Sequence, residues 1–107
     1  MTIEERNERM EWVNDKVKRL ANSKGKSYAS EDDSLANFKR NADRLGLTKY
    51  QVWSVYFGKH IDSIFNAIKY NPEKPIDESE GLEGRIYDAI TYLHILYCLL
   101  NEDKGTE

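Results

Sequence analysis

The fold is decided by the segment Glu83-Gly84-Arg85-Ile86-Tyr87-Asp88-Ala89-Ile90-Thr91-Tyr92-Leu93-His94-Ile95-Leu96-Tyr97-Cys98-Leu99-Leu100, the most apolar stretch of a polar chain. At about 100° per residue, two apolar stripes run along a helix formed by this segment. The first stripe contains Ile86, Ile90, Leu93, Tyr97 and Leu100, with Ala89 and Leu96 at its edge, and the second contains Tyr92, Ile95 and Leu99. A helix that is apolar on nearly every side is usually buried on nearly every side. The sequence therefore predicts that this helix is buried on nearly every side, with the rest of the chain organised around it.

One carboxylate interrupts this apolar pattern. Asp88 lies in line with the second stripe, well inside the helix. Because an unpaired buried carboxylate is costly, we expect Asp88 either to have a partner or to shift its protonation. This is the first indication of a functional site in the sequence.

Composition limits the class of protein. At 107 residues, with 39% hydrophobic and 33% charged residues, the chain is expected to be one soluble globular domain. No apolar run approaches the roughly 18 residues of a membrane span, and the first residues lack a signal-peptide core, so we expect a cytoplasmic protein with no membrane partner. The single cysteine, Cys98, fits a reducing compartment and is interpreted as a packing residue. No basic stripe with interleaved aromatic residues is present, so duplex nucleic acid is not an expected partner.

Capping signals place three further helices. The first begins at the capping box Thr2/Glu5 and is expected to end near Asn22, with Gly25 in the left-handed turn. The second is expected from Leu35 to Leu45, with Gly46 closing it and with Leu35, Phe38, Ala42 and Leu45 on its buried face. The third begins at the capping box Thr48/Gln51 and is expected to reach Tyr70. Its apolar face contains Trp53, Phe57, Ile61, Ile64 and Ile68, with Phe65 and His60 flanking it.

The remaining segments complete the expected architecture. Pro72 and Pro75 make residues 71–82 a loop, the last helix is expected from about Leu82 to Leu100, and residues 101–107 form a polar tail. Since no strand pattern is present, the sequence predicts an all-α protein, a four-helix bundle. The last two helices carry apolar residues on two sides. We do not expect four short helices to bury all of these residues. We therefore predict a homodimer that uses the spare faces.

Three polar groups are candidates for chemistry: the loop from Tyr28 to Asn37, the turn Lys59/His60/Asp62, and Glu83/Arg85/Asp88. Carboxylates on facing helices can hold Mg²⁺, so Asp62, Glu83 and Asp88 are candidate metal ligands and candidate catalytic residues, and residues 31–33 could join them. Lys59, Arg85 and either Lys24 or Lys26 would supply positive charge for phosphates. Structural interpretations stay open: Lys59 and Asp62 as a solvated helix pair, Asp32 and Asp33 as helix-dipole residues, and His60 as a packed histidine.

Four short motifs carry a resemblance to a known family. They are Lys24-x-x-x-Tyr28-Ala29, Asp33-Ser34-Leu35-x-Asn37-Phe38, Lys59-His60, and Glu83-Gly84-Arg85-Ile86-x-Asp88-x-x-x-Tyr92-Leu93. Together they resemble the nucleotide-modification-associated domain family, whose members are small all-α proteins common in bacteriophages. That family looks related to the MazG-like nucleoside triphosphate pyrophosphohydrolases. The similarity covers residues 24–100 and leaves the first helix as an additional element.

The resemblance implies a nucleotide ligand, a MazG-like bundle and a phage-encoded protein that acts in the cytoplasm of the host cell. The ligand-binding residues would then be Lys24, Tyr28, Asn37, Lys59, His60, Arg85 and Asp88. MazG-like enzymes bind Mg²⁺ through a Glu-x-x-Glu pair on one helix and a Glu-x-x-Asp pair on the next. Here Arg85 stands three residues before Asp88, and the preceding helix has Lys59-x-x-Asp62. A cation thus replaces an acid on each helix, which favours direct capture of a phosphate by Lys59 and Arg85, with Asp62 and Asp88 orienting them.

Three functions follow from these observations. The first is a nucleotide-binding protein that takes part in nucleotide metabolism or sequesters a nucleotide signal of host defence. The second is a Mg²⁺-dependent pyrophosphohydrolase that uses Asp62, Glu83 and Asp88. The third is a non-enzymatic inhibitor that binds a host protein through the acidic loop 71–83. No cofactor is expected apart from Mg²⁺ in the enzyme, and the identity of the nucleotide stays open.

Overall fold

The computed structural model describes the backbone of residues 1–28, 33–77 and 81–105, and the side chains of these residues except 24–28. Four helices are present in this part of the chain: α1 (Ile3–Tyr28), α2 (Ala36–Leu45), α3 (Lys49–Tyr70) and α4 (Leu82–Lys104). The described residues contain no strand, which confirms the all-α class. Within the same residues, no helix combines the length and the apolar character needed to cross a membrane.

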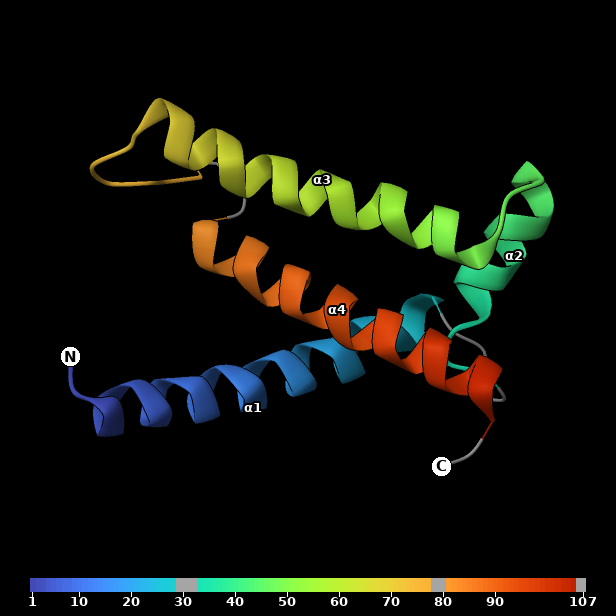
Figure 1. Ribbon diagram of the computed structural model, residues 1–107, viewed down its shortest axis with the longest axis horizontal. Helices are drawn as coiled ribbons and strands as arrows, with labels where there is room; N and C mark the ends of the chain where they lie inside the picture. Colours follow the sequence, from blue (N-terminus) through green and yellow to red (C-terminus); the bar gives the residue numbers. More distant parts are fainter. Residues whose placement is uncertain (29–32, 78–80, 106–107) are drawn as a thin grey trace.

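The three long helices lie in a row, with α4 in the middle (Figure 1). Helix α3 packs along one side of α4 in the opposite direction, and α1 packs along the other side in the same direction. The short helix α2 packs on the beginning of α3. The central position predicted for the last helix is therefore confirmed. The row is one helix thick over much of its length, which leaves faces of α4 and α3 in contact with solvent.

The helix starts follow the predicted capping signals. At α3, the backbone N–H of Gln51 donates to Thr48 Oγ1 (3.1 Å) and the backbone N–H of Thr48 donates to Gln51 Oε1 (2.8 Å), which completes the capping box. At α1, the backbone N–H of Glu5 donates to Thr2 Oγ1 (3.1 Å). Gly46 ends α2 in the left-handed conformation, with φ of 66°.

Two helix ends differ from the prediction. Helix α1 does not end near Asn22 but continues through Gly25 to Tyr28. A glycine inside a helix costs only about 1 kcal/mol relative to alanine, so Gly25 does not have to end it. Helix α4 continues beyond Leu100 to Lys104, and residues 101–104 therefore belong to the helix and not to a polar tail. Contacts made by the carboxylates of this last turn, described below, explain the extension.

The core lies where α2, α3 and α4 meet. Phe38, Ala42 and Val52 are buried together, and Trp53, Tyr56, Tyr92 and Ile95 pack around them. The ring of Phe38 meets those of Tyr56 and Tyr92 edge-on, at centroid distances of 6.0 and 6.2 Å. The indole N–H of Trp53 donates to the backbone oxygen of Tyr92 (2.6 Å) and joins α3 to α4. The second stripe of α4, which contains Tyr92, Ile95 and the fully buried Leu99, thus faces the core.

Several residues expected on buried faces are exposed. The buried residues of α3 are Val52, His60 and Ala67, whereas Phe65 is 64% exposed and Ile68 is exposed too. On α2, Leu45 lies outside the core, since it is 65% exposed. The expectation that α4 is buried on nearly every side is wrong, because its first stripe faces solvent at Ile86, Leu93, Tyr97 and Leu100. Each of α3 and α4 has apolar residues on two sides, and the position of the neighbouring helix decides which side is covered.

Candidate functional site

The candidate site begins with a part-buried ion pair at the start of α4. Arg85 lies in the first turn of α4, and its Nε donates to Asp77 Oδ2 (3.0 Å), which comes from the segment that connects α3 to α4. The side chains of Arg85 and Asp77 are only 13% and 12% exposed. The backbone holds this geometry, because the N–H of Gly81 donates to the oxygen of Asp77 (2.9 Å) and the N–H of Arg85 donates to the oxygen of Gly81 (3.3 Å). These contacts hold the connecting segment against the first turn of α4, beside Arg85.

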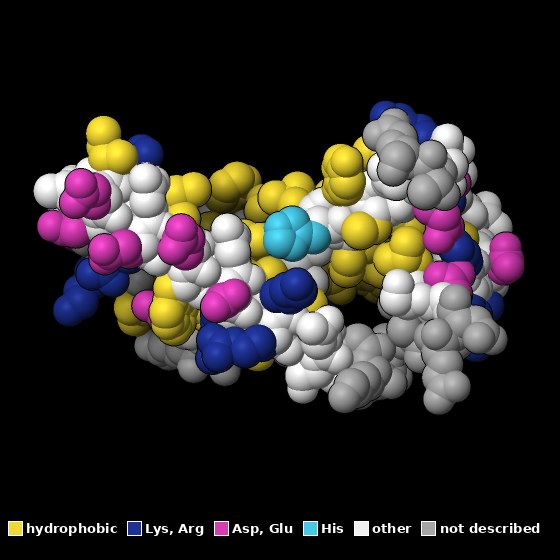
Figure 2. Space-filling view, turned by 90° about the horizontal axis from the view of Figure 1, so that it is seen from below, with side chains coloured by type: hydrophobic (Ala, Val, Ile, Leu, Met, Phe, Trp, Pro, Cys, Tyr) yellow, Lys and Arg dark blue, Asp and Glu magenta, His cyan; other side chains and the backbone are white. Residues whose placement is uncertain are grey.

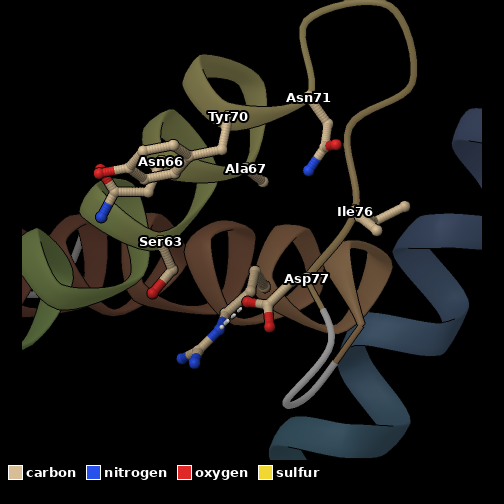
Figure 3. A pocket seen from close by; sticks show the side chains of 8 residues that line it. Ser63, Asn66, Ala67, Tyr70, Asn71, Ile76 and Asp77 are labelled. Atoms are coloured by element: carbon tan, nitrogen blue, oxygen red, sulfur yellow. Dashed lines mark hydrogen bonds and ion pairs between the residues drawn. The ribbon is translucent and has the colours of Figure 1, made fainter.

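A pocket of about 350 Å³ opens beside this pair (Figure 3). Figure 3 shows Ser63 and Asn66, from α3, on one side of the hollow and Asn71, Ile76 and Asp77, from the connecting segment, on the other. The full lining consists of Ser63, Asn66, Ala67, Tyr70, Asn71, Ile76, Asp77 and Arg85. The pocket thus combines a guanidinium group, a hydroxyl, two amides and an aromatic ring. These groups suit a ligand that has both an anionic group and a flat ring.

His60 and Asp88, two predicted site residues, lie close together between α3 and α4. His60 is buried, and its Nδ1 is 3.7 Å from Asp88 Oδ2. The His60 ring also packs on Tyr92, at a centroid distance of 5.1 Å. Asp88 therefore lies beside a histidine, which agrees with the expectation that this carboxylate has a partner. This arrangement fits the structural interpretation of His60 as a packed histidine.

The other predicted site residues are spread over the molecule. Lys59 and Asp62 on α3 and Glu83 on α4 are exposed. Asn37 lies on α2, which packs at the beginning of α3, whereas the pocket lies at the end of α3. The side chains of Lys24 and Tyr28 are outside the described residues. Of the predicted ligand-binding residues, Arg85 is therefore the one that the described lining of the pocket contains.

A carboxylate cluster for a metal ion is not found in the described part of the chain. No group of three or more His, Cys, Asp or Glu side chains there is close enough to hold a metal ion. Asp62, Glu83 and Asp88 are therefore not gathered into a common site. Residues 31 and 32, which the sequence suggested as additional ligands, lie outside the described residues.

No family model, no curated protein and no solved structure matches the chain. The resemblance to the nucleotide-modification-associated domain family therefore stays a prediction, and the chemistry of the site is argued from its residues.

Most of the pocket lining was missed by the sequence analysis, although two signals point to it. Lys59, Ser63, Asn66 and Tyr70 are spaced by four, three and four residues, so they form one polar stripe along α3. Asp77 lies in a long proline-containing connection, a kind of segment that often carries function. The predicted carboxylates for orienting Lys59 and Arg85 were Asp62 and Asp88, but the structure shows Asp77 bonded to Arg85. The sequence does not reveal this pairing, because the path of the connection decides it.

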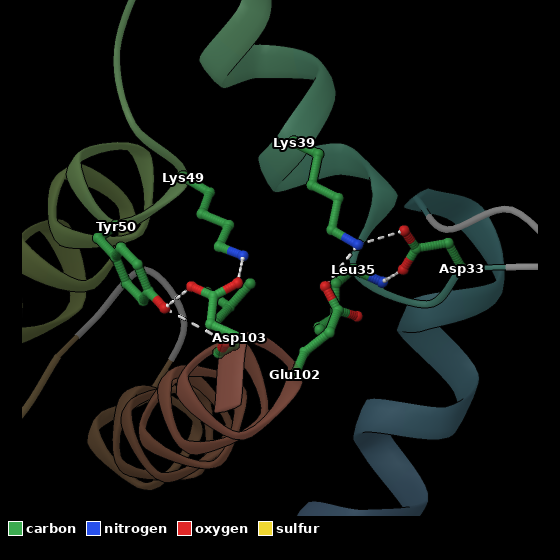
Figure 4. A network of polar contacts seen from close by, with 8 residues as sticks. Asp33, Leu35, Lys39, Lys49, Tyr50, Glu102 and Asp103 are labelled. Carbon is green, nitrogen blue, oxygen red and sulfur yellow. Dashed lines mark hydrogen bonds and ion pairs between the residues drawn. The ribbon is translucent and has the colours of Figure 1, made fainter. Parts of the chain in front are cut away.

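A second polar cluster joins the ends of the helices (Figure 4). Lys39 Nζ is 2.6 Å from both Asp33 Oδ2 and Glu102 Oε1, so it links α2 to the last turn of α4. Asp103 accepts hydrogen bonds from Lys49 Nζ and from the hydroxyl of Tyr50, both at the start of α3. The hydrogen bonds from Lys49 and Tyr50 lower the pKa of Asp103. Because Glu102 and Asp103 of α4 pair with Lys39 of α2 and Lys49 of α3, the cluster holds the ends of three helices together.

Proposed function

We propose that this chain is a nucleotide-binding protein and that its ligand occupies the pocket beside Arg85. The supporting observation is the part-buried Arg85–Asp77 pair in a pocket that also contains amides, a hydroxyl and a tyrosine ring. A guanidinium group whose Nε is fixed by a carboxylate is oriented before the ligand arrives, so little conformational entropy is lost on binding. Such an arginine suits a phosphate group.

The start of α4 favours the same ligand. Arg85 lies in the first turn of this helix, where the unsatisfied backbone N–H groups and the helix dipole attract negative charge. Gly81 precedes the helix with φ of 79° and makes no side-chain cap. A phosphate near Arg85 would therefore gain from the helix terminus as well as from the guanidinium group.

We propose that the protein binds the nucleotide without hydrolysing it. The metal-dependent alternative needs a group of converging carboxylates, and the described residues do not contain one. A protein that holds a nucleotide and leaves it intact would fit a role in nucleotide metabolism or the sequestration of a nucleotide signal, in a phage-infected cell if the family resemblance holds. Its site of action would then be the cytoplasm of the host.

We also propose that the protein acts as a homodimer. Viewed from the α1 side of the row, hydrophobic side chains gather along one edge of the molecule (Figure 2). The apolar face, defined here as Ile86, Leu93, Tyr97 and Leu100 of α4, is at least 40% exposed at each residue. Domains normally consist of two packed layers of secondary structure, and a second copy would supply the second layer.

Calorimetric titration of the full chain with nucleoside mono- and triphosphates, with and without Mg²⁺, tests nucleotide binding. We expect a saturable complex with unmodified nucleotide. Arg85→Gln should weaken it at least about tenfold, or 1.4 kcal/mol, because the phosphate loses its charged partner. Asp77→Asn should strengthen it, since the pocket loses a negative charge and Asn keeps an oxygen for Arg85 Nε.

The matched control is Arg44→Gln, which removes an exposed arginine from α2, away from the pocket. Its affinity should equal that of the wild type. Circular dichroism of each variant shows whether the fold is retained. If folded Arg85→Gln and Asp77→Asn both bind like the wild type, or if no nucleotide binds, the proposal is wrong.

A further inference from the structure

We infer that the pocket selects a nucleotide with a single phosphate group, bound without a metal ion, over the corresponding triphosphate. This inference rests on the proposed nucleotide-binding function and specifies the class of ligand. Three features of the described lining lead to it: its charge, the hydrogen bond that engages its carboxylate with Arg85, and its apolar side chains.

The charge of the described lining is balanced. Arg85 contributes one positive charge, and Asp77, bonded to it, contributes one negative charge. One phosphate group already carries a charge of about −1.5 to −2 at pH 7, and each further phosphate adds to it. Proteins that hold triphosphates surround them with additional cations and with Mg²⁺. One arginine that is already paired with a carboxylate suits a single phosphate.

The described lining is poorly suited to hold Mg²⁺, which would supply the additional positive charge that a triphosphate needs. Mg²⁺ in nucleotide sites is held by one or two carboxylates together with the phosphates. In the lining described, Asp77 is the carboxylate, and its Oδ2 accepts a hydrogen bond from Arg85 Nε. Drawing Asp77 to a metal would remove the group that orients the arginine. No cluster of three potential metal ligands lies elsewhere among the described residues.

The apolar side chains of the lining suit a nucleobase. Tyr70, from α3, and Ile76, from the connecting segment, are 72% and 47% exposed, so they present apolar surface to an incoming ring. Stacking on a tyrosine accepts any base, because every base has a π face. Asn66 and Asn71 each have an amide that both donates and accepts hydrogen bonds, as the edge of a base requires. The volume of about 350 Å³ lies at the small end of the range for ligand pockets, roughly 300–1,000 Å³.

The test compares each nucleoside monophosphate with its own triphosphate and with inorganic phosphate, by calorimetry on the full chain. Every titration is run once with EDTA and once with excess Mg²⁺. We expect one monophosphate to bind at least about tenfold more tightly than its triphosphate and than inorganic phosphate, with the same affinity under both conditions. Tyr70→Ala should weaken this complex at least about fivefold, whereas Tyr70→Phe, which keeps the ring, should bind like the wild type.

The failures are distinguishable. A triphosphate that binds as tightly as the monophosphate, or more tightly when Mg²⁺ is added, overturns the inference and leaves the proposed function intact. If inorganic phosphate binds as tightly as the monophosphate, the nucleobase is not recognised and the inference is overturned. If Tyr70→Ala and Tyr70→Phe weaken binding equally, the nucleobase does not stack on the Tyr70 ring, and the inference is overturned as well. If no nucleotide binds at all, the proposed function fails together with the inference.

Discussion

Lys39 uses a single ammonium group to join two carboxylates from different parts of the chain. Its Nζ lies 2.6 Å from Asp33, just before α2, and 2.6 Å from Glu102, in the last turn of α4. The hydrogen bond from Lys39, followed by that from the backbone N–H of Leu35, lowers the pKa of Asp33. The hydrogen bonds to Asp33 and Glu102 raise the pKa of Lys39 to about 12. Asp33 therefore acts as a structural anion at the start of α2, which agrees with its interpretation as a helix-start residue.

This pairing predicts a particular loss of stability in acid. The pKa of Asp33 is lower in the folded chain than its unfolded value of about 3.9, so its contribution to stability is present above pH 4 and is lost as the pH falls through the folded value. In urea unfolding, Asp33→Asn should be less stable than the wild type at pH 6. The difference between their midpoints should shrink towards zero at pH 3, where the carboxyl group is protonated.

The matched control is Asp43→Asn, which removes the same charge from an exposed position on α2. A difference between wild type and Asp33→Asn that stays constant from pH 6 to pH 3 would contradict the role assigned to Lys39.

At the site, one of the two charged residues that line the pocket was named from the sequence. Arg85 was named as a source of positive charge for phosphates, and the family resemblance sets it where MazG-like enzymes have an acid. Asp77 was not, because its position beside Arg85 depends on how residues 71–77 turn back towards α4. Local spacing along a helix can be read from the sequence, whereas the path of a proline-containing connection depends on tertiary packing.

At the scale of the helices, the capping box of α3 is the best place to measure how much a helix cap contributes to the free energy of unfolding. Thr48→Ala removes the acceptor for the Gln51 N–H at the start of a helix that packs on α2 and α4. It should lower the free energy of unfolding by about 1 kcal/mol, measured by urea denaturation.

Thr2→Ala is the matched change at α1, where Thr2 Oγ1 accepts the N–H of Glu5 at the same distance of 3.1 Å. The first residues of α1 are exposed, so this end can fray without disturbing the core, and the loss should be a few tenths of a kcal/mol at most. Equal losses in the two variants would show that the start of α1 unfolds together with the rest of the molecule.

The same elements show how far sequence patterns determine the fold. The starts of α1 and α3 and the end of α2 were predicted within a residue, because capping depends on residues three or four positions apart. The buried faces of α3 and α4 were less well predicted. Phe65 and Leu93 fit a helical apolar stripe as well as Tyr92 does, and nothing in the spacing says which stripe meets a neighbour. The continuation of α4 to Lys104 depends on Lys39, Lys49 and Tyr50, which belong to other helices.

On the scale of the whole molecule, the apolar face of α4 predicts self-association. Leu93 is 51% and Tyr97 65% exposed, and with Ile86 and Leu100 they form one apolar stripe along α4. Sedimentation at micromolar concentration should therefore give about twice the chain mass of 12.5 kDa. Leu93→Lys should shift the protein to a monomer, because a charged group would be buried between the two copies.

Leu45→Lys is the matched control, since Leu45 is equally apolar and 65% exposed but lies on α2, outside the apolar face. It should leave the dimer intact. A clean monomer of the wild type at micromolar concentration, or a dimer that survives Leu93→Lys, would remove the proposed interface.

The row of helices also has a consequence for synthesis of the chain. Helix α1 is made first, but its main contacts are with α4, which is the last of the four helices. At about 5–20 residues per second, several seconds separate the two on the ribosome. During that interval α2 and α3 can already pack through Phe38 and Val52, while Val17 has no α4 surface on which to be buried. The many charged side chains of α1 keep this helix in solution until α4 emerges and packs against it.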